Sequence, residues 1–390
     1  MKKILFYHPW IYLKGGAEKV LLEYALRTKH DVTIATSYYN KHTTFKEFAN
    51  INVVVLKGIT EVSVERSLGN ILKSFVSICT LKVHNDYDLI IISSEGLGDF
   101  FRCIYPSFNR KKMAYVHTPL KIIYDPKLSK ALKNDLSTKN FYIYNIIKPI
   151  YKIINKIIWK KYDCVLVNSN EVKKRIVNNS LYEKNIDIIH PGANIPSKYK
   201  KFDLLLNKKT FLIPGRIMWQ KRIEIVIDAF IKMNKHDTEL VIMGTVDEKS
   251  KKYLDKLLLL SKNVKNIRIL DNPIDEVYSK TFNECYSVVF SPECEDWGIV
   301  PIESMSLGKP VIAMNQCGPQ ESIIHKKTGY LVNNFDSESF QIGIEYIYSL
   351  NRSEYKKVSR FCYEHSKKFS WNAFTEKLDK KIEQVLYNEC

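Results

Sequence analysis

The sequence predicts an α/β protein built from two doubly wound parallel sheets. Short, apolar, β-rich runs alternate with segments of helical periodicity along nearly all of the 390 residues, and strands that alternate with helices form parallel sheets. The alternation runs to about residue 196 and begins again after about Phe202. We therefore expect two Rossmann-like domains, 1–196 and 207–370, that face each other across a cleft.

The first domain opens with an apolar run, Lys3–Tyr7, which is followed by Gly15-Gly16 and then by a helical pattern through Val20, Leu21 and Tyr24. Later β-rich runs in this half lie between helix-like segments. These runs predict strands at Val32–Ala35, Asn52–Leu56, Leu89–Ile92, Ala114–His117 and Cys164–Val167.

The second domain repeats the pattern. Strands are expected at Phe211–Pro214, Leu240–Met243, Ile267–Leu270, Ser287–Phe290 and Val311–Ala313. Helices are expected at Ile223–Met233, Lys249–Leu260, Glu276–Glu284 and Pro301–Leu307. The segment 371–390 carries apolar residues at helical spacing from Trp371 to Val385, so it should form one amphipathic helix that crosses between the domains and packs back on the first.

Composition limits the partners and the compartment. The formal net charge of +18 favours polyanions, which include nucleic acid, anionic membranes and phosphorylated substrates. None of the eight cysteines forms a Cys-x-x-Cys pair, so reduced thiols in the cytoplasm are expected. The apolar run after Met1 is too short for a signal peptide, and no stretch reaches the length of a membrane span, which predicts a soluble or peripheral protein.

The segment from Ser291 to Lys309 is the first candidate site. Glu295 lies in the loop after a predicted strand, and Glu303 lies eight positions later, in what should be the first turn of a helix that has Pro301 near its start. Helix N-termini attract phosphate, and Gly298 lets backbone approach a ligand closely. Taken alone, the two carboxylates could equally be a helix-stabilising acid and a solvated loop acid.

Two cations follow the first strand of the second domain. Gly215-Arg216 comes directly after Phe211–Pro214, and Lys221 precedes the next helix. Ligands of open α/β sheets bind at the carboxyl ends of strands, where these cations could hold a diphosphate. A solvated cluster with Arg222 at a helix start is the alternative.

Together these residues resemble glycosyltransferase family 4, which has the GT-B fold. The stretch Glu295–Glu303 is similar to the family's Glu-x7-Glu motif, in the form found in bacterial mannosyltransferases of O-antigen and capsule assembly. Further matches lie at Gly15-Gly16-Ala17-Glu18, His117-Thr118-Pro119, Asn168-Ser169-Asn170, Pro214-Gly215-Arg216 to Lys221-Arg222, Gly308–Ala313 and Thr328–Val332. Departures are Lys121, where the branch commonly has Arg, and Trp297, where it has Phe; the larger Trp297 should alter the sugar pocket.

The resemblance implies roles for these residues. Arg216 and Lys221 would neutralise the departing diphosphate. Glu303 would bind ribose and Glu295 the sugar ring, while His117 would lie near the transferred sugar. The backbone and side chains expected to bind the donor nucleotide-sugar are those of Gly15, Gly16, Arg216, Lys221, Glu295, Trp297, Gly298, Ile299, Val300 and Glu303.

The expected function is that of a retaining, metal-independent glycosyltransferase. It would move a hexose, with mannose from GDP-mannose favoured, to a glycan or lipid-linked acceptor in surface polysaccharide synthesis, without a cofactor, because the cations carry the charge that a metal would otherwise carry. Alternatives are a UDP-sugar donor, a nucleotide-sugar epimerase, or a sugar phosphorylase. A basic nucleic-acid-binding protein is the non-enzyme alternative, but no known binding module supports it, and we expect no nucleic-acid partner.

A basic segment lies between Phe141 and Lys161. Lys148, Lys152, Lys156 and Lys160 recur every four residues, isoleucines fill the other side, and Pro149 suits a helix that begins there. Such a helix could touch an anionic membrane surface on the inner face of the membrane, or could be a domain helix with a solvated basic face.

Overall fold

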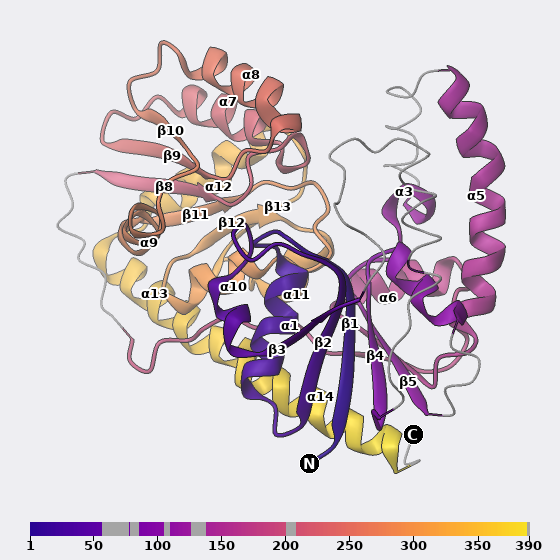
Figure 1. Cartoon of the computed structure of the whole chain (residues 1–390). Coiled ribbons are helices and arrows are strands. Elements are labelled where there is room, and N and C mark those ends of the chain that lie inside the picture. The colour runs from indigo at the N-terminus through magenta and orange to yellow at the C-terminus, as the bar shows by residue number, and fades with distance from the viewer. Residues whose placement is uncertain (57–77, 79–85, 105–109, 126–137, 200–207, 388–390) are drawn as a thin grey trace. The chain divides into compact units, whose positions relative to one another are not determined.

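The computed structural model describes residues 1–56, 78, 86–104, 110–125, 138–199 and 208–387 (Figure 1). The chain divides into two compact units. Unit 1 comprises Met1–Pro191 with Trp371–Cys390, and unit 2 comprises Gly192–Ser370. The last segment of the chain therefore belongs to the same unit as the first.

Unit 1 is built on a seven-stranded parallel sheet in the order β3-β2-β1-β4-β5-β6-β7. Its strands are β1 (Lys3–Ile11), β2 (Asp31–Tyr39), β3 (Asn52–Val55), β4 (Leu89–Ser94), β5 (Lys111–Val116), β6 (Cys164–Val167) and β7 (Ile186–Ile188). Its helices are α1 (Gly16–Arg27), α3 (Lys121–Tyr124), α5 (Thr138–Trp159), α6 (Asn170–Asn178) and α14 (Trp371–Leu386), with short 3-10 turns at Lys46–Asn50 and Leu97–Ile104.

Helices cover both faces of this sheet, because successive side chains of a strand point to opposite faces. Leu5 and Tyr7 of β1 join the core under α5 and α6. The opposite face carries Phe6, whose ring meets Tyr24 of α1, and Tyr115, whose ring meets Phe374 of α14. Helix α14 also packs along α1, where the Tyr24 hydroxyl donates to Asp379 at 2.9 Å (Figure 1).

Unit 2 repeats the architecture with six parallel strands in the order β10-β9-β8-β11-β12-β13. The strands are β8 (Lys209–Pro214), β9 (Thr238–Gly244), β10 (Ile267–Asp271), β11 (Ser287–Phe290), β12 (Val311–Met314) and β13 (Gly329–Val332). The helices are α7 (Ile223–Met233), α8 (Lys251–Ser261), α9 (Asp275–Glu284), α10 (Ile299–Ser306), α11 (Cys317–Ser322), α12 (Ser337–Ser349) and α13 (Arg352–Ser366), with 3-10 turns at Trp219–Lys221, Glu248–Ser250 and Lys367–Phe369.

The core of unit 2 also lies on two sides of its sheet. Phe211 and Ile213 of β8 pack against α7, α8 and α12, whereas Leu212 points to the other side, toward Phe282 of α9. On that other side, Val311 and Ala313 of β12 pack with Ile302 of α10. The predicted α/β fold with two parallel, Rossmann-like sheets is confirmed.

In both sheets the direction in which successive strands are added reverses at a corresponding point. In unit 1 the chain moves outward from β1 to β3 and then returns to place β4 on the other side of β1; in unit 2, β8 and β11 stand in the same relation. In open α/β sheets, ligands bind beyond the carboxyl ends of the strands at such a switch point. The residues that follow β1, β4, β8 and β11 are therefore the first place to look for a site.

Several boundaries differ from those expected. Helix α10 begins at Ile299 rather than Pro301, and α5 runs through Pro149 rather than beginning there. Strands β7 and β13 were not expected, and β7 has only three residues and no visible alternation. The residues at the expected domain junction, 200–207, lie outside the described part of the chain.

Candidate functional site

Charged residues gather at the switch point of unit 2. Gly215 and Arg216 follow β8, and Ser291 opens the loop after β11, which leads to Glu295. The Lys221 ammonium lies 2.7 Å from a Glu295 carboxylate oxygen, and both side chains are partly exposed. The Ser291 hydroxyl donates to the Lys221 carbonyl at 2.6 Å, which ties the two loops together. The structure thus brings Lys221 and Glu295, which lie 74 residues apart, into direct contact.

The Gly215 loop is held by close backbone packing. Gly215 has φ +114°, a conformation that glycine adopts readily. Its N–H donates to the Met243 carbonyl at 3.0 Å, and a Cβ at Gly244 would fall on the Gly215 carbonyl. The Arg216 side chain, next in the chain, is exposed. An exposed cation on a fixed loop suits the binding of an anion from solvent.

Helix α10 begins inside the Glu295–Glu303 stretch. Gly298 caps it with φ +82°, and a Cβ there would lie 3.0 Å from the Phe290 ring. Because the helix starts at Ile299, its unpaired backbone N–H groups belong to Ile299, Val300 and Ile302, since Pro301 has no N–H. Glu303 is the fifth helical residue, so its expected place in the first turn is wrong. Glu303 instead faces Tyr278 of α9, where its charge, after burial, raises the pKa of the Tyr278 phenol.

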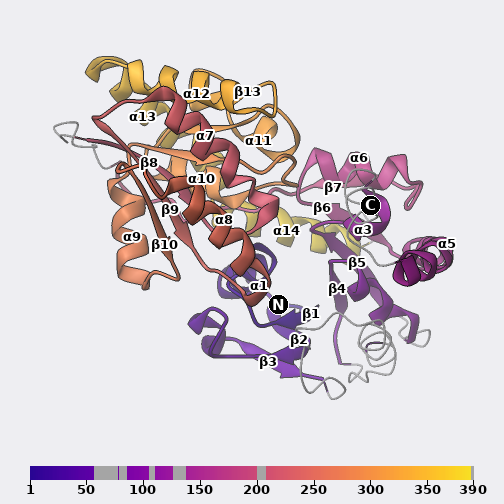
Figure 2. The ribbon, with the colours of Figure 1, turned by 90° about the horizontal axis from the view of Figure 1, so that it is seen from above.

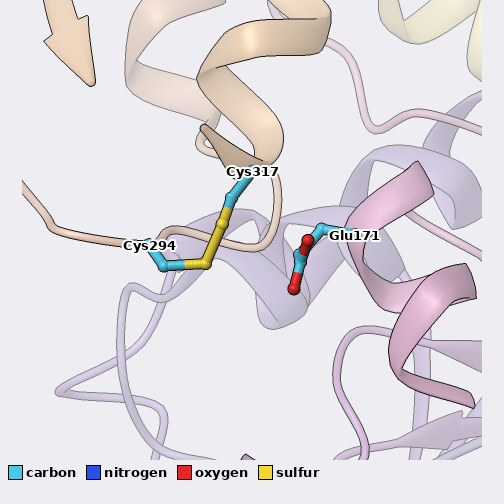
Figure 3. A group of neighbouring side chains, drawn as sticks. All are labelled: Glu171, Cys294 and Cys317. Atoms are coloured by element: carbon cyan, nitrogen blue, oxygen red, sulfur yellow. A yellow bond between two sulfur atoms is a disulfide. The ribbon is translucent and has the colours of Figure 1, made fainter. Parts of the chain in front are cut away.

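A disulfide fixes the loop that carries Glu295. Cys294 and Cys317 are bonded across 23 residues, with their Cα atoms 5.6 Å apart (Figure 3). The Glu295 carbonyl accepts from the Gly318 N–H at 2.9 Å, and the Gln316 side chain donates to the Glu293 carbonyl. The expectation of reduced thiols is therefore wrong for this pair, because folding brings the start of α11 beside the β11 loop. Cys164, Cys285 and Cys362 are free and buried.

Trp297 is a core residue. Its side chain is only 2% exposed and packs with Ile302, while its ring lies 5.3 Å from that of Phe369. A Cβ at Gly318 would overlap the Trp297 backbone, so that glycine permits the close packing. Whether the Trp297 indole alters the sugar pocket stays a prediction. The indole holds the loop between Glu295 and α10 in place.

In unit 1, Gly15 caps α1 and Gly16 is its first residue. The Gly15 carbonyl accepts from the Lys19 N–H at 3.0 Å. A Cβ at Gly15 would collide with the carboxylate of Glu18, which is buried over the start of the helix. Both glycines thus lie where the helix presents its positive dipole end.

His117, the first residue after β5, belongs to a buried polar cluster with two residues that sequence reasoning missed. Its Nε2 lies 2.9 Å from the Ser93 hydroxyl of β4, and the same hydroxyl lies 2.8 Å from Nδ1 of His8 in β1. Burial lowers the pKa of each imidazole to about 3, and for His117 the neighbouring His8 contributes to this lowering. Both rings are therefore neutral at neutral pH.

Helix α5 exposes its isoleucines rather than its lysines. The inward side holds Tyr151, Asn155, Ile158 and Trp159, and buried Asp99 accepts from Asn155 at 3.2 Å and from the Trp159 indole at 3.0 Å. The outward side is apolar, with Ile146, Ile150, Ile153 and Ile157 each more than half exposed. Lys148, Lys152 and Lys156 flank this side and are half-buried, whereas Lys160 is exposed. The alternative of a plain solvated basic face does not fit these exposures.

Helix α5 stands at the outer side of unit 1, beyond β4 and β5, in both views (Figures 1 and 2). Within the described ranges of the chain, no helix is long and apolar enough to cross a membrane. The exposed isoleucines thus belong to a surface helix that packs on the sheet through its other side.

Comparison with known proteins shows which sequences the chain resembles. Residues 195–367 match the model of the family "Glycosyl transferases group 1". The chain is 27% identical over 389 residues to the Dictyostelium discoideum protein named alpha-1,3/1,6-mannosyltransferase ALG2, covering 85% of this chain and 86% of that one. Its Candida glabrata counterpart is 25% identical over 379 residues, covering 83% and 78% respectively.

Solved structures show the same fold. Anabaena Alr3699/HepE, solved with UDP and glucose, superposes with a TM-score of 0.75 at 17% identity and covers 98% of this chain and all of that one. Sucrose-phosphate synthase from Thermosynechococcus elongatus superposes with a TM-score of 0.76 at 16% identity, with both chains fully covered. The two-sheet fold, the family match and the similar enzymes lead to one conclusion: the chain is a glycosyltransferase of the GT-B fold, and its residues 195–367 match the glycosyl transferases group 1 family.

Proposed function

We propose that this enzyme transfers mannose from GDP-mannose to a lipid-linked glycan, with retention of configuration and without a metal ion. The Lys221–Glu295 pair at the switch point of unit 2 carries the proposal. It joins a cation suited to a diphosphate with a carboxylate suited to sugar hydroxyls. The similarity over most of the chain to proteins named alpha-1,3/1,6-mannosyltransferases supports mannose as the sugar and a glycan as the acceptor.

The leaving diphosphate sets the largest electrostatic demand of glycosyl transfer, because negative charge grows on it as the glycosidic bond breaks. In our proposal Arg216 and Lys221 bind that charge, and the N–H groups of Ile299 and Val300 at the start of α10 add to it. Lys221 would exchange part of its contact with Glu295 for phosphate oxygens. The freed Glu295 carboxylate would then accept from the hexose hydroxyls.

The other contacts divide the donor between residues of different chemistry. Glu303 would accept from the ribose hydroxyls. Gly15 and Gly16 would offer backbone N–H groups to the diphosphate, and neutral His117 would hydrogen-bond the transferred sugar. Because two cations and a helix start supply the positive charge, the scheme needs no divalent ion, and transfer should persist in EDTA.

The first experiment is a binding panel. A donor at 100 times its dissociation constant stabilises a protein by about 2.7 kcal/mol, which a thermal-shift assay detects. We expect GDP-mannose to raise the melting temperature more than UDP-glucose or UDP-GlcNAc does. A larger shift with a UDP-sugar would move the proposal to that donor, and no shift with any donor would remove the donor site.

The second experiment tests the site residues by transfer. Glu295→Ala and Arg216→Ala should abolish mannosyl transfer and leave the fold intact. Matched controls are Glu248→Ala and Arg268→Ala, whose side chains are exposed on the same unit. Full activity in either site variant excludes that residue, and turnover of the donor sugar without any acceptor would favour an epimerase instead.

A further part of the proposal concerns location. We propose that α5 lies on an anionic membrane surface, on the inner face of the membrane, where lipid-linked acceptors are within reach. Exposed isoleucines beside lysines are typical of interfacial helices, in which apolar side chains enter the acyl region and lysines meet the headgroups. Ile150→Glu with Ile153→Glu should abolish co-sedimentation with phosphatidylglycerol vesicles, whereas Leu258→Glu, at an exposed leucine of α8, should not. Equal sedimentation of both variants would contradict the membrane role of α5.

A further inference from the structure

Three neighbouring strands of unit 1 bring together one hydroxyl and two imidazoles. β1, β4 and β5 lie side by side in the sheet (Figure 1), and they carry His8, Ser93 and, one residue past its end, His117. Ser93 is fully buried, and the two histidines are 3% and 7% exposed. The cluster lies at the switch point of this sheet, where ligands of such folds bind.

The Ser93 hydroxyl has a single proton for two ring nitrogens. It lies within hydrogen-bond distance of His8 Nδ1 and of His117 Nε2. Among the described residues these two nitrogens are the partners of the buried hydroxyl, so its proton is satisfied only when it goes to one of the rings, and the oxygen then accepts an N–H from the other. Since both imidazoles are neutral, the tautomer of one ring fixes the tautomer of the other. Ser93 therefore couples the protonation patterns of His8 and His117.

The backbone of His117 leaves the ring little freedom. Its N–H donates to the Ser94 carbonyl at 3.1 Å, and its carbonyl accepts from the Asn168 side chain at 2.9 Å. The Tyr115 ring packs against the imidazole with its centroid 5.2 Å away. With Nε2 engaged by Ser93, Nδ1 is the ring nitrogen that remains for a ligand.

We infer that Ser93, supported by His8, is a positioning residue that holds the His117 ring in one tautomer, so that Nδ1 meets a hydroxyl of the transferred sugar. The inference rests on the proposed function for its substrate. A neutral imidazole exchanges hydrogen bonds with a hydroxyl but gives no ion pair to a carboxylate. The ring therefore suits an uncharged hydroxyl group of the donor sugar.

The first test needs only the wild-type protein. With ¹⁵N-labelled histidine and His117→Asn to assign its signals, NMR should show a single neutral tautomer of His117 from pH 6 to pH 8. A mixture of tautomers, or an imidazolium at pH 7, would overturn the inference. Because this measurement needs no substrate, it stands even if the proposed donor is wrong.

The second test separates positioning from folding. Ser93→Ala should lower kcat about ten- to a hundredfold, as loss of a residue that orients another commonly does. It should leave the dissociation constant of the bare nucleotide unchanged and should let the second tautomer of His117 appear by NMR. Ser94→Ala is the matched control, since Ser94 is adjacent, equally buried and in a strand position that points to the other face.

The outcomes are distinct. If Ser93→Ala keeps wild-type kcat and a single His117 tautomer, Ser93 does not position His117. If Ser93→Ala does not fold, His8→Phe replaces it: it removes the other partner of the hydroxyl, and His117 should then show both tautomers. If the wild-type enzyme transfers no hexose from any donor, the proposed function fails, while the NMR result still decides the tautomer.

Discussion

The two units share one strand order but place opposite chemistry at the same point of it. At the switch point of unit 1 lie His8, Ser93 and His117, which are buried and neutral. At the switch point of unit 2, Lys221 and Glu295 are charged groups in contact and partly open to solvent. Burial disfavours charged forms, whereas partial hydration preserves them. The same scaffold therefore places neutral hydrogen-bonding groups at this point in one unit and charged groups in the other.

The largest expected effect is a loss of stability of unit 1 at low pH, which tests the neutral imidazoles at its switch point. The folded pKa of about 3 for His8 and His117 lies below the usual value of 6.5, so their stabilising effect is complete above pH 6.5 and is lost as the pH falls toward 3. Between pH 7 and pH 5, unit 1 should lose about 2 kcal/mol for each histidine. Hydrogen exchange should show the amides of β4 and β5 losing protection, and the double variant His8→Asn, His117→Asn should flatten this pH dependence.

Unit 2 serves as the internal reference in that experiment. Its strands β11 and β12 should keep their protection over the same pH range, apart from changes also seen in the double variant. An equal loss in both units would mean that general acid destabilisation, and not the two imidazoles, dominates.

The next effect is a loss of activity, which tests the charged groups at the switch point of unit 2. Lys221→Met keeps the length of the side chain and removes its charge, and it should lower kcat about a hundred- to a thousandfold, as removal of one group that stabilises a developing anion does. Steady-state transfer assays measure this change. Lys265→Met, at an exposed lysine of the same unit, should remain within twofold of wild type. If the two variants behave alike, Lys221 carries no phosphate charge.

The disulfide between Cys294 and Cys317 should stabilise unit 2 and leave the stability of unit 1 unchanged. Closing a loop of this size stabilises a fold by about 3 kcal/mol in the chain-entropy account. A reductant should lower the urea midpoint of unit 2 and raise the KM for the donor, because Glu295 adjoins Cys294. Cys294→Ser should behave like the reduced protein and should not respond to the reductant. If the reductant changes neither the urea midpoint nor the donor KM of the wild-type protein, the disulfide contributes nothing to the stability of unit 2 or to donor binding.

The smallest effect separates backbone strain from crowding. Gly215 and Gly298 both have positive φ, but a Cβ at Gly215 would meet no atom within 4 Å, whereas one at Gly298 would lie 3.0 Å from Phe290. Gly215→Ala should cost about 1 kcal/mol of stability, and Gly298→Ala should cost about 2 kcal/mol. Thermal unfolding measures both. A smaller loss for Gly298→Ala would mean that the Phe290 ring moves aside freely.

Local sequence patterns predict much of this fold. Helix α7 has the expected bounds because its apolar period is regular, and β6 matches because four buried residues stand between turns. Pro301 lies in the first turn of α10 as expected, but the helix begins two residues before it, because a proline suits any position of the first turn and does not mark the start. Strand β7 has only three residues, which is too few for a period to be visible.

The parts of the site that sequence reasoning missed depend on contacts between distant segments. His8 and Ser93 are 85 residues apart and meet only because β4 pairs with β1. Cys294 and Cys317 meet because the start of α11 packs on the loop after β11. The apolar side of α5 was visible in the sequence, but its outward direction is set by Asp99, which holds Asn155 and Trp159 inward.

The place of α14 in unit 1 has a consequence for biosynthesis. This helix pairs Asp379 with Tyr24 and with Thr28, across more than 350 residues of chain. A ribosome releases Gly192–Ser370 before it releases Trp371–Leu386, and domains generally fold as units once their residues have emerged. Unit 2 can therefore fold first, while the face of the first sheet that α14 covers waits for the end of translation. During that interval the apolar side chains around Tyr115 lack Phe374, and a chaperone that binds exposed apolar segments would find its target there.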